Sequence, residues 1–385
     1  MDSGNKLFLL DAYALIYRAY YAFIKNPRIN SKGFNTSAIL GFVNTLEEVL
    51  KKENPTHIGV AFDPAGPTFR HEAFEQYKAQ REETPEAIRL SVPIIKDIIR
   101  AYRIPILEVA GYEADDVIGT LATEAGRQGI TTYMMTPDKD YGQLVSDKVF
   151  MYRPKHTGGF EVMGVEEVKA KFDIQSPAQV IDMLGLMGDS SDNIPGCPGV
   201  GEKTAQKLIS EFGSIENLLE HTDQLKGALK TKVETNREMI TFSKFLATIK
   251  IDVPIQLEMD ALVREEADEN SLRSIFEELE FRTLIDRVLK KDISGNGITS
   301  ATGNKVATGK SAPSPLPLFP EEEGGMQGDL FANFTPDEPG EAKKSNLETL
   351  ESLTYNYQLI DTEEKRRKII QKLLTSKILS LDTET

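Results

Sequence analysis

Short apolar runs alternate with longer stretches of helical period over the first 150 residues, and this alternation restricts the fold more than any other feature of the sequence. The runs expected to be strands are Leu7–Leu10, Ile58–Phe62, Ile104–Val109 and Thr132–Met135. The stretches expected to be helices are Ala38–Lys51, Ile88–Tyr102 and Asp115–Gln128, with Pro93 predicted to kink or shorten the second. Strands joined by helices form parallel sheets with right-handed crossovers. The pattern therefore predicts an α/β fold with a mostly parallel central sheet flanked by helices.

The pattern changes three times after this region, which predicts four segments. An α/β domain at 1–164 is followed by an almost wholly helical subdomain at 165–293. Residues 294–346 are rich in Gly, Ser, Pro, Ala and Glu, a composition typical of a disordered linker. Residues 347–385 are expected to be the truncated start of another α/β domain, because roughly 40 residues are too few for a core of their own.

Carboxylates follow directly after three of the predicted strands, namely Asp11, Asp63 and the pair Asp138 and Asp140. In an open parallel sheet the carboxyl ends of the strands meet at one crevice, so these acids should face a common space. Two further acidic groups stand at the start of a predicted helix and in the sequence Gly-Asp-Ser-Ser-Asp-Asn-Ile-Pro: they are Glu113, Asp115 and Asp116, and Asp189 and Asp192. Any one group alone is more often a turn or a helix cap.

Five acidic groups at one edge of a sheet would repel one another, and divalent cations would remove that cost. Oxygen ligands favour Mg²⁺ or Mn²⁺, and the sequence has no cluster of His and Cys that would indicate zinc. Two such ions about 4 Å apart are the machinery of phosphodiester hydrolysis. The net charge of -15, from 60 acids and 45 bases, argues against a nucleic-acid partner unless the acids gather on metal ions.

A glycine-rich turn precedes a predicted helix near residue 200. Gly199 and Gly201 flank Val200, and backbone N–H groups at such a turn can bind a phosphate. Lys203 and Lys207 follow at positions i and i+4 of the helix. The segment nearly matches a P-loop, but Glu202 stands where that motif requires Lys and no strand precedes it. A plain helical hairpin remains the alternative to phosphate binding.

Bases alternate with aromatic residues between Thr68 and Arg81, a pattern typical of single-strand binding. The bases are Arg70, Lys78 and Arg81, and the aromatic residues are Phe69, Phe74 and Tyr77. A similar group follows Asp11 on a predicted helix and consists of Tyr17, Arg18, Tyr20 and Tyr21. In both segments a solvated helix face is the alternative interpretation.

Taken in this order, the motifs resemble the 5′-nuclease domain of bacterial DNA polymerase I over residues 5–290. The last residues, Leu379–Thr385, resemble the first motif of the 3′–5′ exonuclease domain of that family. The resemblance implies a PIN-like α/β domain, a helix-hairpin-helix subdomain and an N-terminal fragment without polymerase activity. It implies a 5′–3′ exonuclease and flap endonuclease of DNA replication and repair, whose partners are 5′ flaps, nicked duplex and RNA primers.

The resemblance also implies a role for each motif residue. Asp11, Asp63, Glu113 and Asp115 would hold a first Mg²⁺ or Mn²⁺; Asp138, Asp140, Asp189 and Asp192 would hold or orient a second; and Asp116 would act through water. Arg70, Lys78 and Arg81 would surround the 5′ strand, and Tyr17 and Arg18 would also contact DNA. The duplex-binding hairpin would include Gly199, Gly201, Lys203, Thr204 and Lys207, with K⁺ on its carbonyl groups.

Two other functions stay open at this point. One is a DNA-binding module without catalysis, and the other is a phosphatase with Asp11 as nucleophile, although Tyr13 stands where a second Asp is expected. Gln327–Phe331 is similar to short motifs that dock on the bacterial sliding clamp, while Leu316–Phe319 shows that this stretch has other stray apolar residues. With one cysteine and no apolar run near the ~20 residues of a membrane span, we expect a cytoplasmic, nucleoid-associated monomer without membrane contact.

Overall fold

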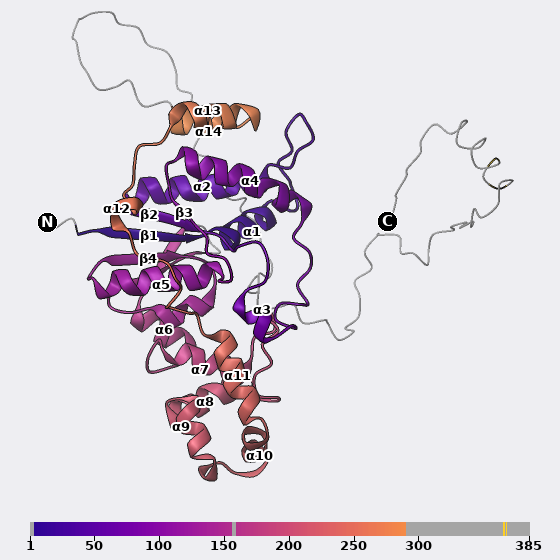
Figure 1. Cartoon of the computed structure of the whole chain (residues 1–385), viewed down its shortest axis with the longest axis vertical. Coiled ribbons are helices and arrows are strands. Elements are labelled where there is room, and N and C mark those ends of the chain that lie inside the picture. The colour runs from indigo at the N-terminus through magenta and orange to yellow at the C-terminus, as the bar shows by residue number, and fades with distance from the viewer. Residues whose placement is uncertain (1–3, 156–158, 290–364, 366, 368–385) are drawn as a thin grey trace, which may run out of the picture. The chain divides into compact units, whose positions relative to one another are not determined.

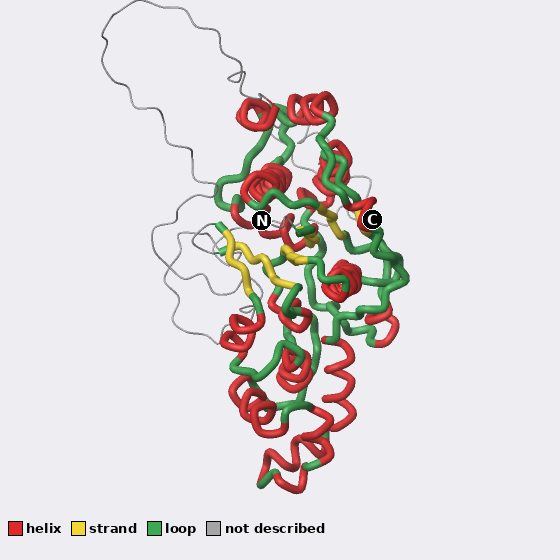
Figure 2. Tube along the Cα trace, turned by 90° about the vertical axis from the view of Figure 1, so that its left-hand side faces the viewer, coloured by secondary structure: helices red, strands yellow, loops and turns green. Residues whose placement is uncertain are grey.

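The computed structural model describes residues 4–155 and 159–289, together with Lys365 and Arg367. Within these ranges, six strands form one sheet in the order β3-β2-β1-β4-β5-β6, seen almost edge-on in Figure 1 and in yellow in Figure 2. Neighbouring strands are parallel except β5 and β6. The strands are β1 Lys6–Asp11, β2 His57–Ala61, β3 Ile106–Leu107, β4 Thr131–Met135, β5 Val149–Pro154 and β6 Phe160–Met163. The predicted mostly parallel α/β sheet is confirmed.

The central strand β1 is buried on both faces, as its continuous apolar sequence requires. Leu7 and Leu9 join the core on the side of α5 (Ala114–Arg127), whereas Phe8 and Leu10 join the core on the opposite side. That second core contains the buried faces of α1 (Ala12–Ala22), α2 (Ser37–Lys52) and α4 (Glu86–Ala101). Figure 1 shows α2 and α4 on one side of the sheet and α5 on the other. Alternating side chains of β1 thus pack against helices on both faces of the sheet.

Three expectations about individual elements need correction. The strand expected at Ile104–Val109 is only Ile106–Leu107, because Pro105 lacks an N–H group and β3 pairs with β2 alone. Pro93 does not shorten its helix: α4 continues to Ala101, and the buried Ile95, Ile98 and Ile99 anchor the part after the proline. Strands β5 and β6 were not expected, although Val149–Tyr152 is an apolar run.

The predicted change to helices after residue 165 is confirmed through residue 289. The first group consists of α6 (Val165–Phe172), α7 (Gln179–Met187), α8 (Glu202–Phe212), α9 (Ile215–Glu220), α10 (Gly227–Thr235) and α11 (Arg237–Ala247). The later elements are α12 (Met259–Leu262), α13 (Glu269–Glu278), α14 (Arg282–Leu284) and the π-helical turn η3 (Ile285–Leu289). Leu272 and Phe276 of α13 belong to the core cluster that contains the buried faces of α2 and α4, and Figure 1 shows α13 on the side of these helices away from the sheet.

Several expectations fall outside the described residues. These are the linker at 294–346, the clamp-like motif Gln327–Phe331 and, apart from Lys365 and Arg367, the segment 347–385. In the part of the chain that the structure describes, no helix is both long enough and apolar enough to cross a membrane.

Candidate active site

The first carboxylates lie at the carboxyl ends of β1 and β2, as the strand pattern predicts. Asp11 ends β1 and caps α1, accepting a hydrogen bond from the Ala14 N–H at 3.1 Å. Asp63 follows β2 and accepts the N–H of Ala114, the first residue of α5, at 2.7 Å. Because β1 and β2 are parallel neighbours, the sheet brings both acids to the N-terminus of α5.

The acidic start of α5 is held by a buried arginine. Glu113 is the N-cap of α5, and its own N–H donates to the Asp116 carboxylate at 3.1 Å. The Arg70 guanidinium donates to Glu113 at 3.1 Å and to both oxygens of Asp116 at 2.8 Å. Its remaining donors bind the carbonyl oxygens of Leu246 and Thr248.

This arrangement corrects the prediction that Arg70 contacts the 5′ strand. The side chain of Arg70 is only 1% exposed, and its guanidinium is fully engaged with protein acceptors. A phosphate could reach it only if this buried network opened, and leaving a buried charge unpaired is costly. Arg70 therefore orients Glu113 and Asp116.

Asp138 and Asp140 follow the carboxyl end of β4. Asp138 is the N-cap of the 3₁₀ turn η1 (Lys139–Leu144), and Asp140 lies within it. The Asp138 carboxylate accepts the Asp140 N–H at 2.9 Å. One oxygen of Asp140, Oδ1, is buried and has no hydrogen-bond partner. Burial and the neighbouring charge of Asp138 raise the pKa of Asp140 well above its ordinary value. An unpartnered, desolvated carboxylate oxygen of this kind fits a cation ligand.

Asp189 and Asp192 lie in the loop that follows α7. The main chains of Asp189 and Ile194 exchange two hydrogen bonds, which close this loop. Lys139 reaches Asp189 at 3.2 Å, and Arg81 reaches Asp192 at 2.5 Å. The charges of all five acidic groups therefore act on one another across the carboxyl edge of the sheet, and basic side chains pair with Glu113, Asp189 and Asp192.

The carboxylates perturb one another in the manner of a charge cluster. Burial, followed by the charges of Asp63 and Asp138, raises the pKa of Asp11 to about 7. Burial and the charge of Asp116 raise the pKa of Asp115 well above its ordinary value. These shifts indicate more negative charge than the protein neutralises at this edge, and a bound cation would relieve it.

Basic side chains neutralise part of the negative charge of these carboxylates. Although burial raises it, the pKa of Glu113 lies below its ordinary value because Lys78 and Arg70 face the carboxylate. Among the described residues, no three acidic, histidine or cysteine side chains converge closely enough, as they lie, to ligate one metal ion. Ligation of one ion by three of these side chains therefore requires the carboxylates to move from the positions in which they lie.

Lys78 and Arg81, for which the resemblance implies a place around the 5′ strand, lie against Glu113 and Asp192 on a segment that is hydrogen-bonded to the Asp192 loop. Lys78 Nζ lies 2.9 Å from Glu113, and its N–H donates to the Asp192 carbonyl at 3.0 Å. Asn193 and Gln80 complete the contact through carbonyl groups of the opposite segment. These two cations are positioned to exchange a carboxylate for a phosphate.

The aromatic residues of the same segment do not all face solvent. Tyr77 is buried and donates to Glu113 at 2.9 Å, so its ring is not available to a single strand. Phe69 and Phe74 pack on Phe245 and Phe242 of α11, with ring centroids 6.0 and 5.6 Å apart. Tyr17 and Arg18 lie half-buried on α1, and the Tyr17 hydroxyl contacts Thr84.

The glycine turn is followed by α8, as predicted, and Gly201 is its N-cap. Lys203 and Lys207 are exposed on α8, whereas Thr204 is half-buried. The carbonyl of Gly199, one of the predicted K⁺ ligands, accepts Lys232 Nζ at 3.2 Å. The element before the turn is helix α7 rather than a strand, so the P-loop interpretation does not fit this fold.

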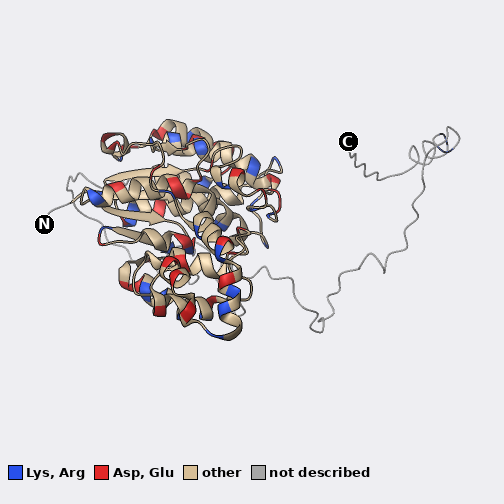
Figure 3. Ribbon diagram, turned by 60° about the horizontal axis from the view of Figure 1, so that its bottom comes forward, with Lys and Arg blue, Asp and Glu red and all other residues tan. Residues whose placement is uncertain are grey.

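The structure adds site residues that the sequence analysis missed. Thr136 and Tyr141 each donate to the Asp11 carboxylate at 3.2 Å, and Lys139 pairs with Asp189. Gln143 binds the carbonyl of Asp140. All four flank Asp138 and Asp140 in sequence, and this proximity was the only available signal. Figure 3 shows ribbon segments of basic residues interspersed with segments of acidic residues over the described elements.

Two family models cover most of the described chain. Residues 6–173 match the N-terminal resolvase-like domain of 5′–3′ exonucleases, and residues 175–270 match the C-terminal SAM fold of the same proteins. The chain belongs to the 5′–3′ exonuclease family. This membership confirms the predicted class of nuclease. Four of the five acidic groups lie within the first matched region, and Asp189 and Asp192 lie within the second.

Among relatives of this exonuclease, DNA polymerase I of Bacillus caldotenax is 42% identical over 287 residues, 74% of the chain and 32% of that protein. DNA polymerase I of Bacillus subtilis is 43% identical over 291 residues, 75% of the chain and 33% of that protein. The chain thus spans about a third of the length of these curated relatives.

Solved structures confirm the fold of the exonuclease. T5 5′-exonuclease with bound zinc superposes with a TM-score of 0.53 at 21% identity, covering 72% of this chain and 99% of that chain. The catalytic core of Rad2 in complex with DNA substrate superposes with a TM-score of 0.51 at 18% identity, covering 75% of this chain and 93% of that chain. At these identities the likeness concerns the fold alone.

Proposed function

We propose that this chain is the 5′-nuclease part of a DNA polymerase I, hydrolysing phosphodiester bonds at 5′ ends and at the base of 5′ flaps during DNA replication and repair. The observation that carries the proposal is the meeting of five carboxylate groups at one sheet edge, with two cations, Lys78 and Arg81, among them. Its substrates are 5′ flaps, nicked duplex and RNA primers, which places the enzyme with DNA in the nucleoid.

The carboxylates would hold two divalent ions, Mg²⁺ or Mn²⁺, because all the donors are oxygen atoms. The first set is Asp11, Asp63, Glu113 and Asp115, and the second is Asp138, Asp140, Asp189 and Asp192. Asp116 supports them from its buried pair with Arg70. The unpartnered Oδ1 of Asp140 and the raised pKa of Asp11 support this assignment. Bound divalent ions supply positive charge for the phosphate oxygens and lower the pKa of water.

The chain's own residues orient the substrate. Lys78 and Arg81 bind the phosphate next to the scissile bond, since both already lie against carboxylates of the crevice. Tyr17 and Arg18 extend this surface along α1. The N–H groups of Gly199 and Gly201, with Lys203, Thr204 and Lys207, bind the phosphates of the duplex. K⁺ at the hairpin and docking of Gln327–Phe331 on a sliding clamp are further parts of the proposal.

The phosphatase alternative is disfavoured by the surroundings of Asp11. A nucleophilic carboxylate needs a free oxygen that faces the substrate. Here Oδ1 accepts the Ala14 N–H and Oδ2 accepts the hydroxyl groups of Thr136 and Tyr141, while the side chain is 9% exposed. Asp11 therefore lacks the free, exposed oxygen that a nucleophile needs.

A labelled 5′-flap duplex tests the proposal directly. We expect Mg²⁺-dependent cleavage that stops on chelation, and loss of cleavage in Asp138→Asn with flap binding retained, because the carboxylates serve chemistry and the bases serve binding. Asp147→Asn, at an exposed position on the loop before β5, is the matched control and should cleave normally. Absence of cleavage by the wild type, or a wild-type rate in Asp138→Asn, would contradict the proposal.

A further inference from the structure

Helix α11 makes a buried contact with the hairpin segment. Ser243, in the middle of α11, has no exposed surface, and its Oγ accepts the N–H of Gly196 at 2.9 Å. Gly196 lies just before the turn that leads into α8. The hairpin segment is therefore joined to α11 by a hydrogen bond to a side chain that has no contact with solvent.

At the same point the hairpin segment crosses the end of α7 with main chain against main chain. Gly196 has a φ of +61°, and a Cβ added there would lie 2.3 Å from the N atom of Gly188. The N–H of Cys197 also donates to the carbonyl of Leu186 at 2.7 Å. Since Gly188 directly precedes Asp189, the hairpin and the Asp189–Asp192 loop start from one rigid crossing.

The C-terminal end of α11 is fastened to the other pair of carboxylates through Gln143. Nε2 of Gln143 donates to the carbonyls of Asp140 and Ala247, both at 3.0 Å. Its Oε1 accepts the N–H of Ile249 at 2.8 Å. One amide side chain thus joins the turn that carries Asp138 and Asp140 to the end of the helix.

The acidic start of α5 reaches the same end of α11. Arg70 donates to the carbonyls of Leu246 and Thr248, and the N–H of Lys250 donates to Asp116 at 2.8 Å. From Ser243 to Ala247 a helix rises about 6 Å, and it resists compression because each turn is closed by hydrogen bonds. The hairpin and two groups of carboxylates are therefore held at a fixed separation by one helix.

We propose that Ser243 and Gln143 are positioning residues, through which α11 sets the distance between the duplex bound by the hairpin and the carboxylates that act on the scissile phosphate. This inference rests on the proposed nuclease function. Its consequence is specific: α11 determines at which nucleotide beyond the duplex junction the strand is cut. Ser243 fixes the register of the duplex, and Gln143 fixes the geometry of Asp138 and Asp140.

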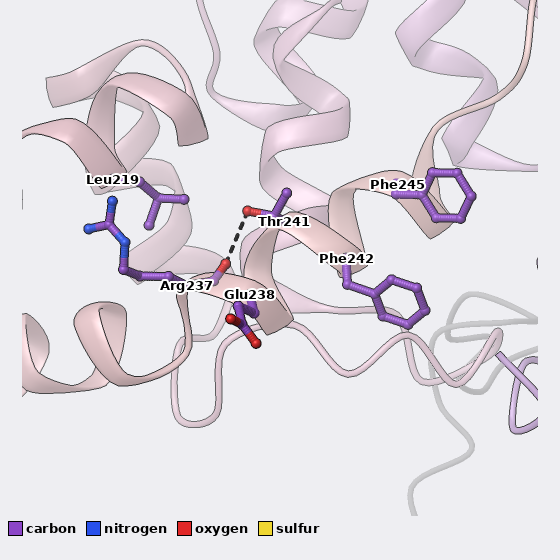
Figure 4. Close-up of a pocket in the computed structure, with 6 residues that line it drawn as sticks. All are labelled: Leu219, Arg237, Glu238, Thr241, Phe242 and Phe245. Atoms are coloured by element: carbon purple, nitrogen blue, oxygen red, sulfur yellow. Dashed lines mark hydrogen bonds between the residues drawn. The ribbon is translucent and has the colours of Figure 1, made fainter. Parts of the chain in front are cut away.

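The variants separate the two roles, and each has a matched control. Ser243→Ala removes the acceptor for Gly196, whereas Thr241→Ala on the same helix removes only a bond to the carbonyl of Arg237, drawn as a dashed line in Figure 4. Gln143→Glu keeps the acceptor for Ile249 but removes both donated hydrogen bonds. Gln175→Glu, at an exposed position before α7, controls for the added charge. If Ser243→Ala fails to fold, Ser243→Cys takes its place, and if Gln143→Glu fails to fold, Gln143→Met takes its place.

For Ser243→Ala we expect KM for a flap duplex to rise about threefold to tenfold with kcat nearly unchanged, as one buried hydrogen bond is lost. The cut, mapped at nucleotide resolution, should spread over neighbouring positions. For Gln143→Glu we expect kcat to fall about 10- to 100-fold at unchanged KM and a single cutting position. Its affinity for Mn²⁺, measured by electron paramagnetic resonance without DNA, should fall to a similar extent.

Each result bears on one residue. A single cutting position and wild-type KM in Ser243→Ala overturn the role of Ser243. Wild-type kcat and Mn²⁺ affinity in Gln143→Glu overturn the role of Gln143, and equal effects in the control variants overturn both. A wild-type protein that cuts no flap substrate contradicts the proposed function instead, so the two failures are distinguishable.

Discussion

At the scale of single residues, Asp11 shows how one side chain serves the fold and the crevice together. It ends β1, caps α1 and is buried next to the charges of Asp63 and Asp138. The capping bond stabilises α1, whereas the neighbouring charges make ionisation of the same carboxylate unfavourable. A cation bound beside Asp11 would favour the ionised carboxylate at neutral pH.

The raised pKa of Asp11 predicts a pH-dependent stability when divalent ions are chelated. The folded pKa of about 7 exceeds the unfolded value of 3.8, so the folded state binds the extra proton between these values. The stability contributed by protonated Asp11 is complete below about pH 4 and is lost as the pH rises through 7, by up to about 4 kcal/mol.

Asp11→Asn keeps the acceptor for the Ala14 N–H and removes the titration. We therefore expect the variant to lose less stability than the wild type between pH 5 and pH 8, as measured by urea unfolding in the presence of a chelator. Parallel unfolding curves for the two proteins across this range would show that Asp11 ionises normally.

Lys78 forms an ion pair with Glu113, a carboxylate that we propose as a metal ligand. Lys78→Met removes the ammonium that lies 2.9 Å from Glu113 and 3.6 Å from Asp192. We expect flap cleavage to fall, because the phosphate loses a partner, while Mn²⁺ affinity rises several-fold, because a competing cation is gone. Lys148→Met, at an exposed position before β5, should change neither quantity. Weaker Mn²⁺ binding in Lys78→Met would contradict this exchange.

At the scale of elements, helices serve as the frame that loops and turns are fastened to. The short helix α3 (Phe69–Ala73) is attached to α5 and to the end of α11 by Arg70, which bonds Asp116 and the carbonyl of Leu246. Arg70→Met leaves Asp116 buried without its partner, so we expect a loss of about 3–5 kcal/mol in the free energy of unfolding. Chemical denaturation measures it, with Arg89→Met on the exposed face of α4 as control. A change below 1 kcal/mol would show that the pair is dispensable.

Helix α8 gives a prediction about DNA binding. Lys203 is exposed one turn from Gly201, where it can neutralise one phosphate of a duplex. Lys203→Ala should weaken duplex binding and lower the slope of log K against log salt by about one. Fluorescence anisotropy over a salt series measures this slope, again with Lys148→Ala as control. An unchanged slope means that Lys203 is only solvated.

At the scale of the whole described unit, two cores lie on opposite faces of one sheet. The first joins α5 to the helices that carry the hairpin, and the second includes α13, more than 200 residues after β1 in sequence. Cations bound at this edge would hold together segments that are far apart in the chain, and therefore act on global stability.

We accordingly expect Mg²⁺ or Mn²⁺ to raise the melting temperature. An ion present at 100 times its dissociation constant stabilises the folded state by about 2.7 kcal/mol. Calorimetry with and without chelator measures the shift, and Asp138→Asn should reduce it. The same shift with Na⁺ at equal ionic strength would indicate simple screening.

Much of the fold and of the carboxylate set could be predicted because these features are local or periodic. Continuous apolar runs indicated β1, β2 and β4, and the acids that follow them had to meet because parallel strands share an edge. Strands β5 and β6 were missed, and β3 was overestimated. Whether these segments form strands, and how long the strands are, depends on the neighbouring strand with which each one pairs.

Composition and order of motifs by themselves determined the α/β class, the acidic crevice and the glycine turn before α8. Tertiary structure alone decided that Arg70 is buried against Asp116 and that Tyr77 donates to Glu113. It also decided that α11 contacts Gln143 through Ala247 and Gly196 through Ser243. The reason is physical: a residue type and its sequence neighbours show which bonds a side chain can make. Which bonds it does make depends on groups brought within 3 Å by packing of segments 36 to 104 residues apart.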